Sequence, residues 1–472
     1  MTRFASSKIA VVVIAIGAAL AFGGRASGQS VRSVHTFNGS DGANPYAALV
    51  QGTDGNLYGT TIDGGANGSG NFFRMARGGK VTSLYDFCSE ANCADGQYPV
   101  TALVEGADGN FYGTTQSGGT FTFGTVFRIT PVGALSVLHS FNGDDGAAPY
   151  GGLVLASNGN FYGSAAVGGT YGAGTIFTIT PGGALTTLYE FCSKPGCSDG
   201  QSPAGTLAQG TDGNLYGVTH VGGSYADCDV NGCGTVFRMT LNGKLKTLHV
   251  FDVSDGEYPY GGLVQAANGV FYGTAAGGGT GNDGTIFTID GSGDFNLLYS
   301  FGGADGASPY QMMLGSDGNL YGVTQYGGTK FVRGSVFECT PDGTLTNLHT
   351  FNGHDGKNPY GLMQDTDGAF YGTTYFGGKN DDGVVFRMST GLAPFVETQP
   401  TFGSVGVQVT ILGTELKGAT AVSFGGVAAA FTVASNSEMV TTVPLGAKSG
   451  AVTVTTAKGE TLQSNVEFRV VK

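Results

Sequence analysis

Seven aspartates that each precede a glycine are the first residues in this chain with the spacing for chemistry. A ring of carboxylates could bind cations or a polyhydroxylated ligand, but Asp before Gly also caps its own turn by accepting hydrogen bonds from backbone N–H groups. Because the residue recurs in every repeat, whereas a site is usually asymmetric, we interpret it as a turn residue. The seven are Asp41, Asp95, Asp145, Asp199, Asp255, Asp305 and Asp355.

Calcium is the one cofactor that these aspartates suggest. A calcium loop needs acidic or amide ligands at alternate positions ahead of a glycine. The nearest sequence, residues 142–146, does not match that motif. We therefore expect no cofactor and no metal site.

A second set of candidates occupies one variable position on a constant scaffold. His220 lies four residues after Tyr216, and the same position holds Gln116, Gln325 and Tyr375 in other repeats. Because the scaffold is constant while the side chain changes, we predict that this ring faces a ligand. Taken alone, His220 is better explained as a solvated loop histidine, since it lacks the partners that catalysis needs. The predicted binding residues are Gln116, His220, Gln325, Tyr375 and the singular His354.

Two further sets recur with the repeats. Four histidines share a strand position with three tyrosines and are interpreted as packing residues with a polar tip: His35, His139, His249 and His349, with Tyr85, Tyr189 and Tyr299. Five tyrosines follow a proline and could stack on sugar rings near a channel mouth, or pack one repeat on the next: Tyr46, Tyr150, Tyr260, Tyr310 and Tyr360. The chain has no Trp, which weakens the sugar hypothesis. No nucleophile elbow or phosphate loop is present, so we predict no catalytic residue.

The elements that must position these residues are seven copies of a unit of roughly 50 residues. In the second unit, residues 100–105 and 111–115 predict one β-hairpin, and residues 125–130 and 135–141 a second. Two hairpins make one blade of a β-propeller. The first unit opens with a lone strand, residues 33–37, and the last unit ends at residues 384–388 without a following strand. Pairing these ends would close seven blades and remove the free sheet edges.

Variation in length falls on one face of such a propeller. The loops between blades and between the second and third strands lie on this long-loop face, and the two hairpin turns lie on the other. Three cysteine pairs, each five residues apart, close insertions there and predict disulfides rather than zinc in an oxidising compartment: Cys88 with Cys93, Cys192 with Cys197, and Cys228 with Cys233. Cys339 is left unpaired. Variable loops on a rigid scaffold often carry binding sites, so we expect the site on this face.

The N-terminus predicts export. Arg3 and Lys8 precede an apolar run, residues 9–22, and small residues up to Gly28. This order is typical of a secretory signal, and the run is too short for a membrane span. Its removal deletes three cations, which takes the net charge from −13 to −16. An acidic surface repels phosphate backbones and anionic membranes, so we expect neither nucleic acid nor membrane as a partner.

The repeats resemble a known family. Their shared sequence, Asp-Gly-Asn-Leu/Phe-Tyr-Gly-Thr with a Gly-Gly loop and Gly-Thr-Val/Ile-Phe, is similar to the GloVer tandem repeat of exported bacterial proteins over residues 31–388. The tail contains Gly406-Val-Gln-Val-Thr-Ile-Leu-Gly413 and resembles an IPT/TIG domain, an immunoglobulin-like module common in surface receptors and carbohydrate-active proteins. Neither resemblance implies a catalytic residue.

We therefore predict an all-β chain: a signal peptide (1–28), a seven-bladed β-propeller (31–390), a linker (391–399) and an immunoglobulin-like β-sandwich (400–472). We expect a secreted or cell-surface monomer that binds an extracellular polysaccharide or a surface protein without catalysis. One alternative is a polysaccharide lyase or glycoside hydrolase, which would need acidic or histidine groups converging at one mouth. The other is a structural spacer in the envelope.

Overall fold

The computed structural model describes residues 30–225, 228, 230–328 and 333–471, and within them the chain is almost entirely β-structure. Its helical content is two short 3-10 turns, η1 (Ala91–Cys93) and η2 (Pro195–Cys197). The predicted signal peptide lies outside the described residues. Among those that are described, no helix has the length and apolar character needed to cross a membrane.

Residues 30–389 form seven four-stranded antiparallel sheets, numbered here 1 to 7 in chain order. In the order of hydrogen-bonded neighbours, sheet 1 contains β2 (Val50–Gln51), β3 (Leu57–Thr61), β4 (Asn71–Met75) and β5 (Val81–Asp86), sheet 2 contains β6 (Val104–Glu105), β7 (Phe111–Thr115), β8 (Thr125–Ile129) and β9 (Leu135–Ser140), and sheet 3 contains β10 (Val154–Leu155), β11 (Phe161–Ala165), β12 (Thr175–Ile179) and β13 (Leu185–Glu190). Sheet 4 contains β14 (Gln201–Gln209), β15 (Leu215–Val221), β16 (Thr235–Met239) and β17 (Leu245–Val250), and sheet 5 contains β18 (Val264–Gln265), β19 (Phe271–Ala275), β20 (Thr285–Ile289) and β21 (Phe295–Ser300). Sheet 6 contains β22 (Ala307–Leu314), β23 (Leu320–Tyr326), β24 (Ser335–Cys339) and β25 (Leu345–Thr350), and sheet 7 contains β26 (Lys357–Gln364), β27 (Phe370–Phe376), β28 (Val384–Ser389) and β1 (Ser30–Thr36).

The repeated Tyr-Gly pair explains how each sheet packs on the next. At four junctions the tyrosine of one sheet meets the Phe that begins the next sheet's second strand, as in Tyr112 and Phe161, whose ring centroids are 4.2 Å apart; in sheets 1, 4 and 6 that strand begins with Leu. The glycine gives room for the Phe of its own third strand, because a Cβ on Gly113 would lie 2.7 Å from Cζ of Phe127. All five residues of β7 are buried, so both faces of this strand are covered. Each sheet is therefore packed between two neighbours, like a propeller blade.

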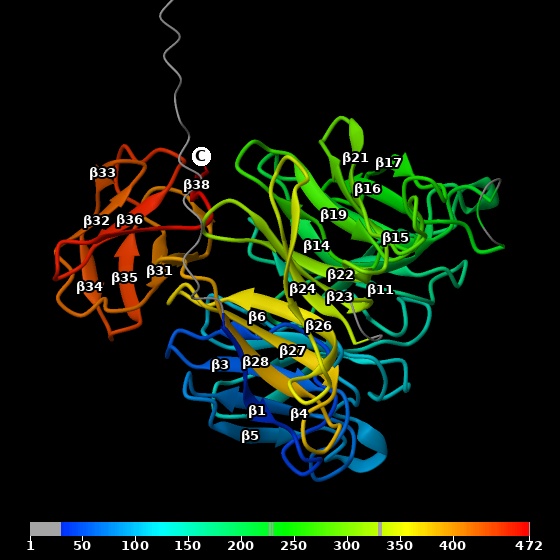
Figure 1. Ribbon diagram of the computed structural model, residues 1–472, viewed down its shortest axis with the longest axis horizontal. Coiled ribbons are helices and arrows are strands. Elements are labelled where there is room, and N and C mark those ends of the chain that lie inside the picture. Colours follow the sequence, from blue (N-terminus) through cyan, green and yellow to red (C-terminus); the bar gives the residue numbers. More distant parts are fainter. Residues whose placement is uncertain (1–29, 226–227, 229, 329–332, 472) are drawn as a thin grey trace, which may run out of the picture.

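The two ends of the repeat region meet. The predicted pairing is present, because β1 pairs with β28 from Ser30 opposite Ser389 to Thr36 opposite Val384. One hydrophobic cluster joins Tyr371 of sheet 7 to Leu57 and Phe73 of sheet 1. An equivalent cluster joins each of the remaining pairs of consecutive sheets, from 1 and 2 to 6 and 7. Figure 1 shows the blue first sheet beside the yellow last one.

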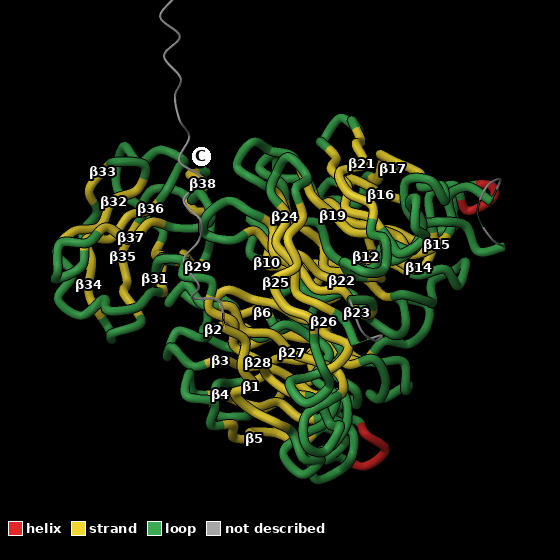
Figure 2. Tube along the Cα trace, in the orientation of Figure 1, coloured by secondary structure: helices red, strands yellow, loops and turns green. Residues whose placement is uncertain are grey.

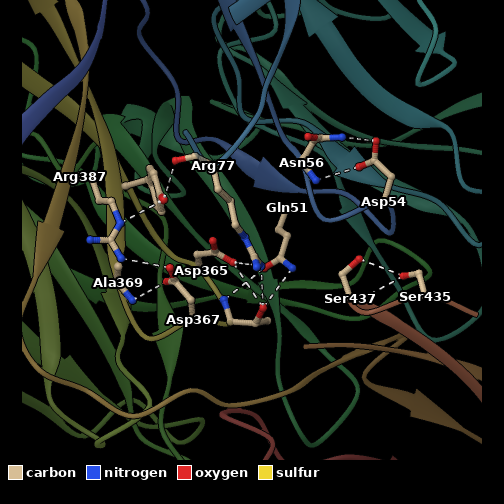
Figure 3. Close-up of polar contacts among 12 residues, drawn as sticks. Gln51, Asp54, Asn56, Arg77, Asp365, Asp367, Ala369, Arg387, Ser435 and Ser437 are labelled. Carbon is tan, nitrogen blue, oxygen red and sulfur yellow. Dashed lines mark hydrogen bonds and ion pairs between the residues drawn. The ribbon is translucent and has the colours of Figure 1, made fainter. Parts of the chain in front are cut away.

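Polar contacts also cross this junction (Figure 3). The Arg77 guanidinium of sheet 1 lies 2.7 Å from the buried Asp365 carboxylate of sheet 7, and the Gln51 amide donates to the Thr366 hydroxyl at 3.1 Å. Burial raises the pKa of Asp365, and Arg77 opposes that rise. The junction between first and last sheets thus combines an apolar cluster with a buried ion pair.

The first strands of sheets 1, 2, 3 and 5 are shorter than predicted. In sheet 2 the predicted strand, residues 100–105, is observed only as β6 (Val104–Glu105). The preceding segments of neighbouring sheets approach one another too closely for side chains: a Cβ on Gly261 would overlap the Tyr310 carbonyl, and one on Gly361 would overlap the Ala48 backbone. Neighbouring inner segments therefore pack backbone against backbone, both beside a short first strand, as at Gly261, and within a full-length one, as at Gly361 in β26.

The C-terminal region forms a separate two-sheet domain with its own apolar core, which includes Val409, Phe424 and Phe468. Its strands are β29 (Glu397–Gln399), β31 (Gln408–Leu412), β35 (Glu438–Thr442) and β34 (Phe431–Val433); β33 (Val427–Ala428), β32 (Ala421–Phe424), β36 (Val452–Thr455) and β37 (Thr461–Gln463); and the parallel pair β30 (Phe402–Gly403) and β38 (Arg469–Val470). The last three residues of the predicted linker form β29, which pairs with β31.

This domain sits on the hairpin-turn face of the repeat region. Arg469 donates to the Gly210 carbonyl in a turn of sheet 4 (2.9 Å), and the Phe395 amide donates to the Thr366 carbonyl in a turn of sheet 7 (3.1 Å). Ser437 lies against Gly55 in a turn of sheet 1. In Figure 2 the two 3-10 turns of the disulfide-containing loops lie on the side of the repeats away from this domain. The long-loop face is thus left uncovered.

Candidate functional site

The five tyrosines that follow a proline meet around the centre of the long-loop face, and we call them the tyrosine collar: Tyr46, Tyr150, Tyr260, Tyr310 and Tyr360. The rings of Tyr46 and Tyr360 stack with centroids 4.2 Å apart. The Tyr310 hydroxyl donates to the Tyr46 hydroxyl at 3.0 Å, and the Tyr260 and Tyr310 centroids are 6.0 Å apart. Four of the five therefore form a continuous cluster contributed by sheets 5, 6, 7 and 1.

A local turn aims each tyrosine inward. In each of the seven inter-sheet loops, the residue before the proline has a positive φ, for example Asn44 at 57° and Tyr258 at 57°. The proline then packs on a glycine of the preceding sheet: a Cβ on Gly124 would lie 2.8 Å from Cδ of Pro149. The glycine before the third strand is thus needed to seat the proline, and the proline places the next side chain at the centre.

The collar tyrosines are neutral hydrogen-bonding groups. Burial raises the pKa of Tyr46, and the neighbouring Tyr310 phenol raises it further. Burial also raises the pKa values of Tyr310 and Tyr360. A phenol in this environment stays protonated at any physiological pH and offers one donor and acceptor oxygens to a ligand.

A depression of about 740 Å³ opens above the collar. We call it the aromatic basin, because six aromatic side chains line it: Tyr46, Tyr150, Tyr326, Tyr360, Tyr375 and Phe376. Two predicted site residues, Gln116 and Tyr375, lie in it. The Gln116 amide donates to the Tyr150 hydroxyl, and the Tyr375 ring is 5.8 Å from that of Tyr360. No residue that lines the basin is acidic.

The other three predicted residues fall in two separate depressions. His220 and Gln325 line one of about 450 Å³, where the His220 ring lies 3.9 Å from the collar residue Tyr260. His354 lies in another, of about 280 Å³, beside Arg333 and Lys357. Lys357 also lines the basin, so this third depression adjoins the basin at its edge.

Tyr326, Phe376 and Lys357 are among the basin residues that were not predicted from the sequence. Tyr326 and Phe376 each follow the variable ring position by one residue, and the Lys357 ammonium lies 5.0 Å from the Phe376 ring centroid. The signal was present, because only the sixth and seventh repeats carry an aromatic residue at that next position. The contact with Lys357 comes from another strand and required the structure.

The seven loop aspartates are held inside their own loops. Each accepts hydrogen bonds from backbone N–H groups, as Asp145 does from Asn142 at 2.9 Å. Each also contacts the His or Tyr that recurs on the preceding strand: His35–Asp41, Tyr85–Asp95, His139–Asp145, Tyr189–Asp199, His249–Asp255, Tyr299–Asp305 and His349–Asp355, at 2.5–3.1 Å. In the described part of the chain, no group of three or more His, Cys, Asp or Glu side chains could hold a metal ion.

Three disulfides join the predicted cysteine pairs: Cys88 with Cys93, Cys192 with Cys197, and Cys228 with Cys233. The prediction of disulfides rather than zinc is confirmed. The remaining cysteine, Cys339, is buried in β24 as a free thiol. Burial raises the pKa of this thiol to about 12, so it is unreactive.

The sequence matches two family models. The model of the Gloeobacter/Verrucomicrobia repeat matches residues 17–230 and 225–429, and the model of the IPT/TIG domain matches residues 395–470. These matches agree with both resemblances noted in the sequence. No curated protein matches this chain.

Several solved structures share the fold. One is the extracellular domain of a protein described as a hybrid two-component system from B. thetaiotaomicron (12% identity, TM-score 0.52, 92% of this chain and 54% of that chain). Another is a fungal alcohol oxidase of the AA5 family in complex with copper (13%, 0.51, 94% and 99%). A third is the WD40 β-propeller domain of Doa1 (11%, 0.50, 76% and 97%). At these identities the likeness shows a propeller-like fold and nothing about activity.

Proposed function

Because the chain belongs to the Gloeobacter/Verrucomicrobia repeat family and ends in an IPT/TIG domain, we propose that it is an exported seven-bladed β-propeller that binds carbohydrate without cleaving it. The seven sheets and the contact of the last with the first support the closed ring. The N-terminal signal-like segment and the three disulfides support export to an oxidising compartment. In this proposal the propeller ends near residue 390 and the sandwich begins near residue 400.

The aromatic basin is the observation on which the proposal depends. Ligand sites are concave and mainly apolar or aromatic, with a few polar groups that fix orientation. Here the rings of Tyr375 and Tyr326 offer flat faces for the C–H face of a sugar, and the Gln116 side-chain carbonyl offers an acceptor for its hydroxyls. The ring of variable residues around the basin would then set which sugar is bound.

Glycoside hydrolysis is less well supported by this geometry. It requires two carboxyl groups on either side of the scissile bond, and none of the basin residues is acidic. Burial and the nearby Asp63 raise the pKa of the basin residue Tyr375, so this carboxyl group lies close to the basin, and the seven loop aspartates are already engaged by hydrogen bonds within their loops. A polysaccharide lyase or hydrolase and an envelope spacer therefore stand as outcomes of the test.

The test is a glycan array and a polysaccharide pull-down on the secreted chain, with and without calcium, followed by product analysis. We expect retention without cleavage, independent of calcium. Tyr375→Ala and Tyr326→Ala should each weaken binding at least ten-fold, because aromatic anchors carry most of the energy at a binding site. Tyr171→Ala is the matched control, since Tyr171 is 55% exposed on another loop.

Cleaved products would overturn the non-catalytic assignment. If no polymer is retained, the protein-partner or spacer hypothesis takes precedence. An equal loss in Tyr171→Ala would show that binding is not centred on the basin.

A further inference from the structure

The tyrosine collar is interrupted over sheets 2 and 4. At the position after the proline, these two repeats carry Val100 and Ala204, whereas the other five carry tyrosine. They are also the two repeats whose inter-sheet loops contain disulfides, Cys88–Cys93 and Cys192–Cys197. Tyr150, between them, is the most exposed collar residue at 43%. The collar is therefore packed closed over sheets 5, 6, 7 and 1 and open over sheets 2 to 4.

An axial cavity of about 230 Å³ lies beneath this opening. Tyr46, Val100 and Tyr150 line both this cavity and the basin, and the inner segments of sheets 1 to 6 supply the rest of its lining. Thr206 and Gln311 supply a hydroxyl and an amide. The cavity is smaller than the about 300–1,000 Å³ of sites for drug-sized ligands, so it suits one sugar residue rather than a chain.

The C-terminal domain covers the opposite end of the axis. It contacts the turns of sheets 7 and 1 through Phe395 and Ser437, and the turn of sheet 4 through Arg469. In a ring of seven sheets, sheet 4 lies across the axis from sheets 7 and 1. The domain therefore lies across this end of the axis, on the face opposite the aromatic basin.

The cavity contains no charge. Its described lining contains no Asp, Glu, Lys, Arg or His. Its tyrosines stay neutral, because burial raises the pKa values of Tyr46 and Tyr310. An ionised sugar such as a uronate would lose its hydration there without gaining a cation, which is costly. A neutral sugar would exchange hydrogen bonds with water for hydrogen bonds with phenols, the threonine and the amide.

We propose that the axial cavity receives the terminal residue of a neutral oligosaccharide chain, which enters beside Tyr150, where Val100 and Ala204 stand in place of tyrosine, while the basin holds the residues that precede it. This inference rests on the proposed carbohydrate binding. It adds that the protein recognises chain ends and not chain interiors.

The opening can be closed with the residue that the other repeats carry. Ala204→Tyr and Val100→Tyr each introduce the tyrosine that the other five repeats carry at this position, so the fold should tolerate them. Val132→Tyr is the control, because it adds a tyrosine at a position that is 77% exposed in a hairpin turn of sheet 2, on the face opposite the collar. The probes are linear neutral oligosaccharides of two to six residues, of the cello, laminari, xylo and manno series, measured by calorimetry on the full secreted chain.

We expect at least a ten-fold loss of affinity in Ala204→Tyr or Val100→Tyr and none in Val132→Tyr. A second measurement uses one polysaccharide cut to different mean lengths, for which the amount of protein bound per gram should rise as the chains shorten. If Tyr375→Ala weakens binding but both collar variants bind as well as wild type, the chain-end inference is wrong and the proposed function stands. If the wild-type chain binds none of the probes or polymers, both are wrong.

Discussion

Glu105 shows how a single residue couples the two domains to pH. It ends β6, is 8% exposed, and accepts a hydrogen bond from the Thr53 hydroxyl at 3.3 Å. Burial raises its pKa to about 7, although hydrogen bonds from Thr53 and from Gln399 of the C-terminal domain oppose the rise. In Glu397, burial and the nearby Asp365 likewise raise the pKa to about 7. The domain boundary thus contains two carboxyl groups that prefer to be protonated.

The sign of the pH dependence follows from that preference. Because the folded pKa lies above the unfolded value of 4.5, the folded state binds more protons between pH 4.5 and about 7, and stability falls as pH rises through that window. Glu105→Gln removes the ionisation. We expect it to stabilise the protein on the order of 2–3 kcal/mol at pH 8 and to have little effect at pH 4.5.

Urea unfolding of wild type and Glu105→Gln at pH 4.5, 6 and 8 measures this difference. Only the difference between the two proteins matters, because other carboxylates titrate in both. A Glu105→Gln effect that does not change with pH would show that burial does not raise the pKa of Glu105 in the folded protein.

At the scale of the element, the inter-sheet loop is held by its aspartate. Asp95 is fully buried and accepts hydrogen bonds from the Tyr85 hydroxyl (2.6 Å), the Ser89 amide (2.9 Å) and the Glu90 amide (3.2 Å). Burial opposes ionisation, but these donors outweigh it and hold the pKa of Asp95 below its ordinary value. The equivalent loops use His in place of Tyr, as in His139 and Asp145, because both side chains can donate to a carboxylate.

This arrangement predicts a graded mutational series. Asp95→Ala leaves several buried donors unsatisfied and should cost about 3 kcal/mol of unfolding free energy. Tyr85→Phe removes one hydrogen bond and should cost about 1 kcal/mol. Tyr85→His should cost less than Tyr85→Phe, since four other loops use histidine at this position. Chemical denaturation checks the order, and a Tyr85→His variant less stable than Tyr85→Phe would contradict the interchange.

At the scale of the whole molecule, the N-terminal strand joins the two ends of the repeat region. β1 is the outer strand of sheet 7, and its neighbour Phe37 lies in the cluster that packs sheet 7 against sheet 1. The Arg77–Asp365 ion pair crosses the same junction (Figure 3). Without β1, the edge of β28 would be exposed, and an unpaired edge favours aggregation.

Deletion of residues 30–37 should therefore cost more than about 4 kcal/mol or make the protein aggregate. The control is a rearranged chain in which residues 30–37 are inserted after residue 389, before the C-terminal domain, through a short flexible linker. We expect this insertion to restore most of the stability, as measured by thermal unfolding and size-exclusion chromatography. A rearranged chain no more stable than the deletion would show that pairing of β1 is not what joins the ends.

The sequence by itself determined the repeats, the principal strands and the disulfides. β7 (Phe111–Thr115) has its predicted bounds, and each cysteine pair forms its predicted bond. These features depend on alternation, turn residues and short separations along the chain, which are local. The role of the loop aspartates in their own turns was predictable for the same reason, because their backbone partners lie within a few residues.

Only the tertiary structure decided which distant residues share a site. Tyr46 and Tyr310 are 264 positions apart yet share a hydrogen bond, and Gln116 and Tyr375 line one basin while His354 does not. The shortened inner strands and the contacts of the C-terminal domain with the turns of sheets 1, 4 and 7 are also visible only in the tertiary structure. The physical reason is that the repeats make every unit look equivalent along the chain, whereas the basin depends on which units differ and where the sheets bring those differences together.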